Sequence, residues 1–275
     1  MIRLIACDLD ETLLDDKKRI PQYNLEKIKE AKDQGVLFVP ASGRGYTSMD
    51  SVLTSLAAYD KEQEYTISNN GGIVVENKGF RHISFHSFTF EQAKALFAYG
   101  IQKDICIEVF TDHDVYAFHL NEDERGWLFM FKKDAQVCQE NSIDFFKDEP
   151  IVKLLFEDTD MERLYTIAED MKHVSDGVAS VSFSSNRYIE LNPLGIDKGV
   201  GLCELCAYLD IPMEETMAIG DNDNDRELLL AAGVSVAVAN ANERIKRIAD
   251  HVTRFDHNEG AVGEAIERFV LGKEC

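Results

Sequence analysis

Short apolar runs alternate along this chain with stretches in which apolar residues recur at helical spacing. A run of four to eight apolar residues is typical of a buried strand, whereas a period of 3.6 residues is typical of an amphipathic helix. The first part of the chain is therefore predicted to contain strands over residues 3–8 and 36–40, helices over residues 24–34 and 47–56, and a strand–turn–strand unit over residues 66–76.

The pattern changes between about residue 82 and residue 188, where predicted strands follow one another through short turns. Such neighbouring strands favour an antiparallel sheet with helices, an α+β arrangement. We expect strands over residues 105–110, 115–119, 152–157, 179–183 and 188–191, and helices over residues 90–99, 124–132 and 161–172.

A regular alternation of helix and strand then returns. Helices are expected over residues 198–209, 226–231, 243–248 and 260–271, and strands over residues 216–219, 235–238 and 251–253. Alternating β and α elements predict a parallel sheet that is covered on both faces. The expected fold class is thus α/β, a Rossmann-like doubly wound core (residues 1–81 and 189–275) with an inserted α+β domain (residues 82–188).

Composition excludes several classes of protein. The 275 residues include 29 Lys and Arg against 50 Asp and Glu, a net charge of −21. We expect no nucleic-acid or membrane partner, because both need clustered cations. No uncharged apolar run approaches the roughly 18 residues of a membrane span. The apolar start is followed at once by acidic residues, unlike a signal peptide. We expect a cytoplasmic protein that is a monomer or a weak homo-oligomer.

Two carboxylates, Asp8 and Asp10, follow the first predicted strand directly. In a parallel α/β sheet, ligands bind beyond the carboxyl ends of the strands. A carboxylate in that place can attack phosphorus when a cation offsets the charge of the substrate, and a second carboxylate can protonate the leaving oxygen. A solvated acidic turn is the alternative interpretation.

Ser42 and Gly43 follow the second predicted strand, and Lys198 begins a predicted helix. A small hydroxyl residue next to Gly lets backbone N–H groups approach a phosphate, and an ammonium group can bind it. Taken alone, Ser42 is also typical of a helix N-cap, and Lys198 of an exposed surface lysine.

Residues 220–225 read Gly-Asp-Asn-Asp-Asn-Asp after another apolar run. Carboxylate and carboxamide oxygens suit a hard cation. An EF-hand is excluded, because the spacing fails and no Glu closes a twelve-residue loop. An acidic loop without a metal is the alternative.

In chain order, these four clusters resemble the four motifs of the haloacid dehalogenase-like phosphohydrolase superfamily. The likeness is best to its Cof-type sugar-phosphatase branch, which carries a large α+β cap. It spans nearly the whole chain and implies that residues 82–188 are the cap. The matching residues are Asp8, Asp10, Thr12, Ser42, Gly43, Arg44, Lys198, Gly220, Asp221, Asn224 and Asp225. Ser42 stands where Thr is commoner, and the turn at Asn70 is also similar to that family.

The resemblance implies a role for each of these residues. Asp8 would be the nucleophile that forms an aspartyl-phosphate, and Asp10 would protonate the leaving alcohol and then activate water. Mg²⁺ would be bound by the carboxylates of Asp8 and Asp221 and the backbone carbonyl of Asp10. Phosphate contacts are implied for Leu9, Ser42, Gly43, Lys198 and Asn224, and supporting roles for Thr12, Arg44, Asn70 and Asp225.

Two of the supporting roles, those of Arg44 and Asn70, stay open at this point. Arg44 either faces the substrate or pairs with nearby carboxylates. Asn70 either orients the loop or the leaving group, or it occupies a turn that needs positive φ. Asp225 would support the metal site, for example by holding Lys198.

The function implied is a Mg²⁺-dependent phosphatase of small phosphorylated metabolites such as sugar phosphates, pyridoxal phosphate or FMN. A hexose phosphomutase and a non-catalytic binder of a phosphorylated ligand are the alternatives. The intact set of Asp8, Asp10, Lys198 and Asp221 speaks against a binder, which needs no nucleophile. The cap would select the substrate, and its candidate contacts are Glu108, His113, Tyr116, Arg187 and Tyr188.

Overall fold

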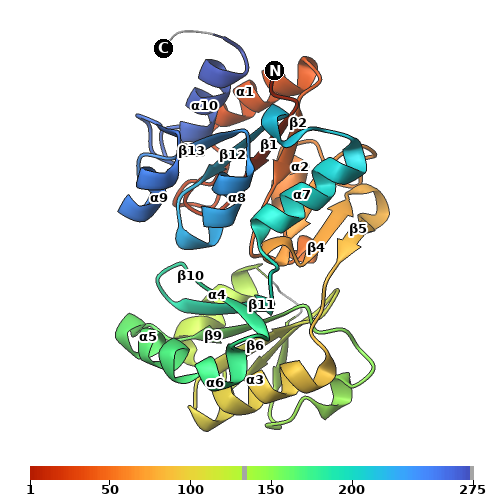
Figure 1. Cartoon of the computed structure of the whole chain (residues 1–275), viewed down its shortest axis with the longest axis vertical. Coiled ribbons are helices and arrows are strands. Elements are labelled where there is room, and N and C mark those ends of the chain that lie inside the picture. The colour runs from red at the N-terminus through yellow and green to blue at the C-terminus, as the bar shows by residue number, and fades with distance from the viewer. Residues whose placement is uncertain (132–134, 273–275) are drawn as a thin grey trace. The chain divides into compact units, whose positions relative to one another are not determined.

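The chain folds into two compact units (Figure 1). The computed structural model describes residues 1–131 and 135–272. The core unit comprises Met1–Phe85 and Asp197–Cys275, and the inserted unit comprises His86–Ile196. The boundaries expected from sequence, at residues 82 and 189, lie earlier than these divisions. The cause is strand pairing, described below, which keeps residues 82–85 with the core unit and residues 189–193 with the inserted unit.

A parallel sheet of five short strands forms the centre of the core unit. Its order is β14-β13-β12-β1-β2. The strands are β1 (Leu4–Cys7), β2 (Leu37–Pro40), β12 (Thr216–Gly220), β13 (Val234–Ala237) and β14 (His251–Val252). All residues of β1 and β12 are buried, as expected for strands that helices cover on both faces.

The helices of the core unit pack in pairs against this sheet. Helix α1 (Gln22–Asp33) contacts α10 (Ala261–Phe269), and α7 (Lys198–Leu209) contacts α8 (Arg226–Ala231). Figure 1 shows α1 and α10 on one side of the sheet and α7 and α8 on the other. The remaining helices are α2 (Asp50–Ser55) and α9 (Glu243–Ile248). The doubly wound α/β core is thus confirmed.

A second, antiparallel sheet joins β3 (Tyr65–Ser68), β4 (Ile73–Glu76) and β5 (Arg81–Phe85). A bridge between Ala41 and Ile67 continues β2 toward this sheet. Strand β5 was not expected from the sequence, because its five residues are exposed or half-buried and show no apolar run.

The inserted unit contains a six-stranded sheet in the order β10-β11-β9-β6-β7-β8. Its strands are β6 (Cys106–Phe110), β7 (Val115–Phe118), β8 (Gln136–Cys138), β9 (Lys153–Glu157), β10 (Ala179–Ser184) and β11 (Tyr188–Pro193). All pairs are antiparallel except β7 with β8. Its helices are α3 (Phe90–Gln102), α4 (Glu122–Phe131), α5 (Met161–Asp170) and α6 (Lys172–Ser175).

One apolar cluster fills the space between this sheet and helices α3, α5 and α6. Leu96 and Phe97 of α3 pack there with Ile107 and Phe156 of the sheet. The α+β character expected for the insertion is therefore confirmed. Among the described residues, no helix has the length and apolar character that crossing a membrane would require.

Candidate active site

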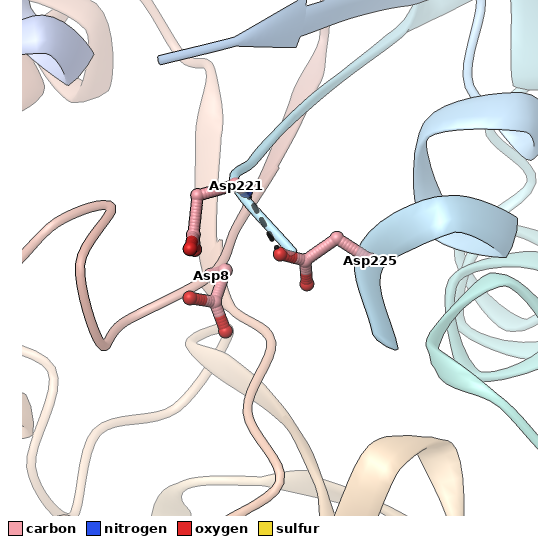
Figure 2. Close-up of side chains that lie close together, drawn as sticks. All are labelled: Asp8, Asp221 and Asp225. Atoms are coloured by element: carbon pink, nitrogen blue, oxygen red, sulfur yellow. Dashed lines mark hydrogen bonds between the residues drawn. The ribbon is translucent and has the colours of Figure 1, made fainter. Parts of the chain in front are cut away.

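Three buried carboxylates meet at the carboxyl ends of neighbouring strands. Asp8 directly follows β1, Asp221 directly follows β12, and Asp225 ends the short 3₁₀ turn Asp223–Asp225. One carboxylate oxygen from each lies within 4.8 Å of the other two (Figure 2). Since β1 and β12 pair in register, the fold brings together two segments more than 200 residues apart in the chain.

Lys198 neutralises part of this charge. Its side chain is fully buried, and Nζ donates hydrogen bonds to Oδ1 of Asp8 at 2.5 Å and to Oδ1 of Asp225 at 2.6 Å. It is the first residue of α7, whose N-cap Asp197 accepts a hydrogen bond from the Val200 amide. Burial would lower the pKa of Lys198, but Asp225 and Asp8 raise it, so the ammonium stays charged. The interpretation of Lys198 as a surface residue is wrong.

The cluster keeps an excess of negative charge that a cation would relieve. Burial, with Asp225 beside it, raises the pKa of Asp8 to about 7 against the pull of Lys198. Burial and the neighbouring Asp8 raise the pKa of Asp221 well above its usual value. Carboxylate oxygens are the ligands that Mg²⁺ prefers, so the donor set fits a divalent cation.

Asp225 is fully occupied with structural hydrogen bonds. Its Oδ2 accepts from the amides of Asp221 at 3.0 Å and Asn222 at 3.2 Å, while Oδ1 accepts from Lys198. Figure 2 shows the bond that joins Asp225 to Asp221. Asp225 thus fixes the loop that presents Asp221 and holds the ammonium of Lys198.

Thr12 orients the carboxylate of Asp221. Its buried hydroxyl donates a hydrogen bond to Asp221 Oδ1 at 2.8 Å. The two residues come from the loops after β1 and β12, so this bond joins the first and last motifs of the site.

Asp10 is held by two cations. Its carboxylate accepts from Arg44 Nε at 2.9 Å and Nη2 at 2.6 Å, and from Lys18 Nζ at 2.8 Å. Burial alone would raise the pKa of Asp10, but Arg44 and Lys18 lower it below the usual value. Of the two interpretations of Arg44, its pairing with a nearby carboxylate is the one observed.

Lys18 was not predicted from the sequence. It lies in a turn with a φ of 57° and follows another lysine. The basic residues 17–19 indicated that a cation could lie near Asp10. Only the geometry of the turn shows that Lys18 is the residue that contacts it.

Ser42 lies buried just beyond β2, on the same edge of the sheet as Asp8. Its hydroxyl accepts from the Arg44 amide at 3.2 Å, and its carbonyl accepts from the Asn70 amide at 3.0 Å. Asn70 has a φ of 53°, so the turn that needs positive φ is present. Leu9 is buried within the loop after β1, whereas Gly43 and Asn224 are half-buried.

Three known proteins show what this chain resembles. The 5-amino-6-(5-phospho-D-ribitylamino)uracil phosphatase YwtE of Bacillus subtilis is 30% identical over 99% of each chain. A haloacid dehalogenase-like hydrolase of B. subtilis shares the structure with a TM-score of 0.85 at 25% identity, over 98% of this chain and 100% of its own. The subclass IIB sugar phosphatase BT4131 shares the fold, with a TM-score of 0.85 at 22% identity over 97% and 98% of the two chains.

A family profile relates this chain to a known family over nearly its whole length. The profile of haloacid dehalogenase-like hydrolases matches residues 5–266, a span that runs from β1 into α10 and contains all four motif clusters. This chain belongs to the haloacid dehalogenase-like hydrolase family.

Proposed function

We propose that this protein is a Mg²⁺-dependent phosphatase of small phosphorylated metabolites. The observation that carries the proposal is the buried Asp8 carboxylate at a strand end, hydrogen-bonded to the ammonium of Lys198 and beside Asp221. A nucleophile held next to a fixed cation suits attack on a dianionic phosphate monoester.

Asp8 would carry the covalent step. One carboxylate oxygen attacks phosphorus, the bond between phosphorus and the ester oxygen breaks, and the leaving alkoxide takes a proton. Water then attacks the phosphorus of the aspartyl-phosphate, which releases inorganic phosphate and restores the carboxylate. The Lys198 ammonium and the amides near Ser42 and Gly43 would stabilise the charge on the transferred phosphoryl group.

Mg²⁺ would be held by the carboxylates of Asp8 and Asp221 and the carbonyl of Asp10. When bound, it would neutralise charge on the phosphoryl oxygens and lessen their repulsion from the carboxylates. Thr12 and Asp225 would keep Asp221 in place through the hydrogen bonds described above.

Asp10 would move the proton, first to the leaving oxygen and then from the attacking water. Its pairing with Arg44 and Lys18 keeps the carboxylate ionised in the present arrangement. These ion pairs lower the pKa of Asp10, so weakening either of them would favour the protonated carboxyl group that gives its proton to the leaving oxygen.

The substrate class rests on the relatives. YwtE is named for a ribitylamino phosphate monoester, and BT4131 is named a sugar phosphatase. We propose that this chain acts on phosphate monoesters of similar size, among them sugar phosphates, pyridoxal phosphate and FMN, and that the inserted unit selects among them.

Release of inorganic phosphate from p-nitrophenyl phosphate tests this function, followed by a panel of phosphorylated metabolites. Activity is expected with Mg²⁺ and is expected to disappear with EDTA. The Asp8→Asn variant should be inactive, because an amide is a poor nucleophile. The matched control Asp33→Asn changes an exposed carboxylate of α1 and should keep full activity. Full activity of Asp8→Asn, or activity that EDTA leaves unchanged, would contradict the proposal.

A further inference from the structure

The turn that follows β13 contacts both of the loops that carry the proposed metal ligands. The Asn242 amide donates a hydrogen bond to the Asp221 carbonyl at 3.0 Å. The side-chain amide of Asn240 (Nδ2) donates one to the Glu11 carbonyl at 2.7 Å. Asp221 follows β12, and Glu11 lies in the loop after β1. We call residues 238–242 the bracing turn, because it touches the loops at two neighbouring strand ends.

The side chain of Asn240 is also held from its other end. Its Oδ1 accepts a hydrogen bond from the His257 amide at 3.0 Å, so both polar atoms of this exposed side chain are bonded. The preceding residue, Ala239, donates its amide to the Thr253 hydroxyl at 3.0 Å. His257 and Thr253 both lie between β14 and α10. The core unit thus holds the Asn240 donor against the Glu11 carbonyl.

Glu11 has a backbone conformation that a residue with a side chain adopts only under constraint. Its φ is 62°, in the left-handed region, where the Cβ atom crowds the following carbonyl oxygen. Gly occupies this region freely, whereas Glu does not. Such conformations persist where surrounding contacts hold them. The hydrogen bond from Asn240 is such a contact, because it ends on the carbonyl of Glu11 itself.

The conformation of Glu11 also sets the direction of the Asp10 carbonyl. That carbonyl belongs to the planar peptide unit before Glu11, so a change in the φ of Glu11 turns this unit relative to Glu11. The loop closes directly afterwards, because the amides of Leu13 and Leu14 donate to the Leu9 carbonyl at 3.0 and 2.9 Å. Relaxation of Glu11 would therefore alter both the direction of the Asp10 carbonyl and the closure of the loop.

We propose that Asn240 is a positioning residue, which holds Glu11 in the left-handed conformation and thereby fixes the Asp10 carbonyl for Mg²⁺. The inference rests on the proposed function, because that function supplies the metal. It deepens the function by giving a residue outside the motif clusters a part in the metal site. Without Asn240, Glu11 relaxes toward an ordinary conformation, and Mg²⁺ binding must restore the strained one.

Titration calorimetry of the full chain with Mg²⁺ alone measures the affinity of the site without turnover. Asn240→Ala should bind Mg²⁺ at least about fivefold more weakly than the wild type, because part of the binding energy then restores the left-handed conformation. Asn141→Ala is the matched control, since Asn141 is also exposed and its side chain also makes a hydrogen bond, at 2.9 Å to His119. This control should bind Mg²⁺ like the wild type.

A rescue experiment distinguishes positioning from a merely structural contact. Glu11→Gln and Glu11→Gly remove the same charge, but only Gly adopts positive φ without strain. Adding Asn240→Ala should weaken Mg²⁺ binding at least about fivefold in the Glu11→Gln protein and less than about twofold in the Glu11→Gly protein. A structural contact unrelated to the backbone of Glu11 would give the same loss in both proteins.

Hydrogen exchange with EDTA present tests the loop without metal or substrate. The amides of Leu13 and Leu14, followed in a peptide that spans residues 9–16, should exchange at least about fivefold faster in Asn240→Ala than in the wild type. This result does not depend on whether the protein is a phosphatase. Thermal unfolding of each variant shows that it is folded.

Three results would overturn the inference while the proposed function stands: equal Mg²⁺ affinity in Asn240→Ala and the wild type, equal losses in the Glu11→Gln and Glu11→Gly proteins, or unchanged exchange of Leu13 and Leu14. Phosphatase activity that EDTA leaves unchanged would contradict the proposed function instead. No Mg²⁺ binding by the wild type would overturn both.

Discussion

At the scale of single residues, the site depends on one buried ammonium group. Lys198 is surrounded by Asp8 and Asp225, with Asp221 close by, and all four side chains are buried. Removing one partner of a buried ion pair leaves the other charge uncompensated, which costs far more than losing an exposed pair.

We therefore predict that Lys198→Met lowers the free energy of unfolding by about 3 kcal/mol or more at neutral pH. The loss should shrink in acid, where the carboxylates take up protons. Phosphatase activity should fall at least about a hundredfold, because the group that offsets phosphoryl charge is gone. Urea denaturation and phosphate release measure both effects. Lys29→Met, which breaks an exposed pair with Asp33, should cost about 1 kcal/mol or less.

Thr12→Val removes the hydroxyl that orients Asp221 while keeping the shape of the side chain. The loss of this bond should weaken the apparent Mg²⁺ affinity several-fold, because supporting hydrogen bonds position metal ligands. A Mg²⁺ titration of phosphatase activity measures the change. Thr54→Val, at an exposed position of α2, is the control. Equal Mg²⁺ affinity in Thr12→Val and the wild type would show that Thr12 does not act through Asp221.

The gathering of the motif residues was predictable, since carboxyl ends of neighbouring parallel strands share one edge of the sheet. Asp8, Ser42 and Asp221 follow that rule. The partners of Asp10 did not follow from sequence. Lys18 reaches Asp10 through a turn with positive φ, and no spacing rule indicates which of several basic residues makes the contact.

At the scale of elements, the start of α7 depends on a turn far away in the chain. Gly71 follows β3 and has a φ of 86°, and a Cβ atom there would lie 2.0 Å from the Asp197 carbonyl oxygen. Asp197 is the N-cap of α7, and Lys198 is its next residue. Close backbone contact at Gly71 thus helps to set the position of Lys198.

Gly71→Ala should consequently disturb both stability and activity. The left-handed backbone alone costs about 1 kcal/mol for a residue with a side chain. The clash with Asp197 should add to that cost and displace Lys198. Gly79→Ala is the matched control, because Gly79 also has positive φ but no atom near the added Cβ. Thermal unfolding and phosphate release are measured for both variants. Gly79→Ala reports the cost of the left-handed backbone alone, and the further loss in Gly71→Ala reports the clash with Asp197. Equal losses in the two variants would contradict this account.

Most elements were predictable because their burial produces periodic apolar patterns. Strands β5 and β8 were not predicted, because neither of them has the buried apolar residues that produce a pattern in the sequence. Strand β5 has no buried residue, and β8 has three residues, of which two are exposed. Such strands form through backbone pairing with β4 and β7, which leaves little trace in the sequence.

At the scale of the whole molecule, each of the two units contains a cluster of buried charged side chains. In the core unit, the buried Asp8, Lys198, Asp221 and Asp225 form the proposed catalytic site. In the inserted unit, the buried Glu108 and Glu157 are joined through Glu124 and Arg187. Burial raises the pKa of Glu124 to about 7, and burial with the neighbouring charge of Glu124 raises the pKa of Glu108 well above its usual value.

The inserted unit should consequently lose stability as the pH rises. A carboxyl group with a raised pKa in the folded state binds its proton more tightly there than in the unfolded chain. Its contribution is complete below about pH 4.5 and is lost as the pH rises through about 7. The pKa of Glu108 is raised as well, and Glu108→Gln removes this second ionisable group. The free energy of unfolding of the variant should therefore exceed that of the wild type by an amount that grows as the pH rises above about 4.5. Urea denaturation over this range, with EDTA present, measures the difference. A difference that does not change with pH would contradict the account.

The most direct test of the central claim is the identity of the phosphorylated residue during turnover. The protein is mixed with substrate and Mg²⁺ and quenched in acid, and the peptides are then analysed by mass spectrometry. The account predicts one phosphoryl group on Asp8, and none in the Asp8→Asn variant. Sustained phosphate release with no phosphoryl group on Asp8, or with the group on another residue, would contradict it.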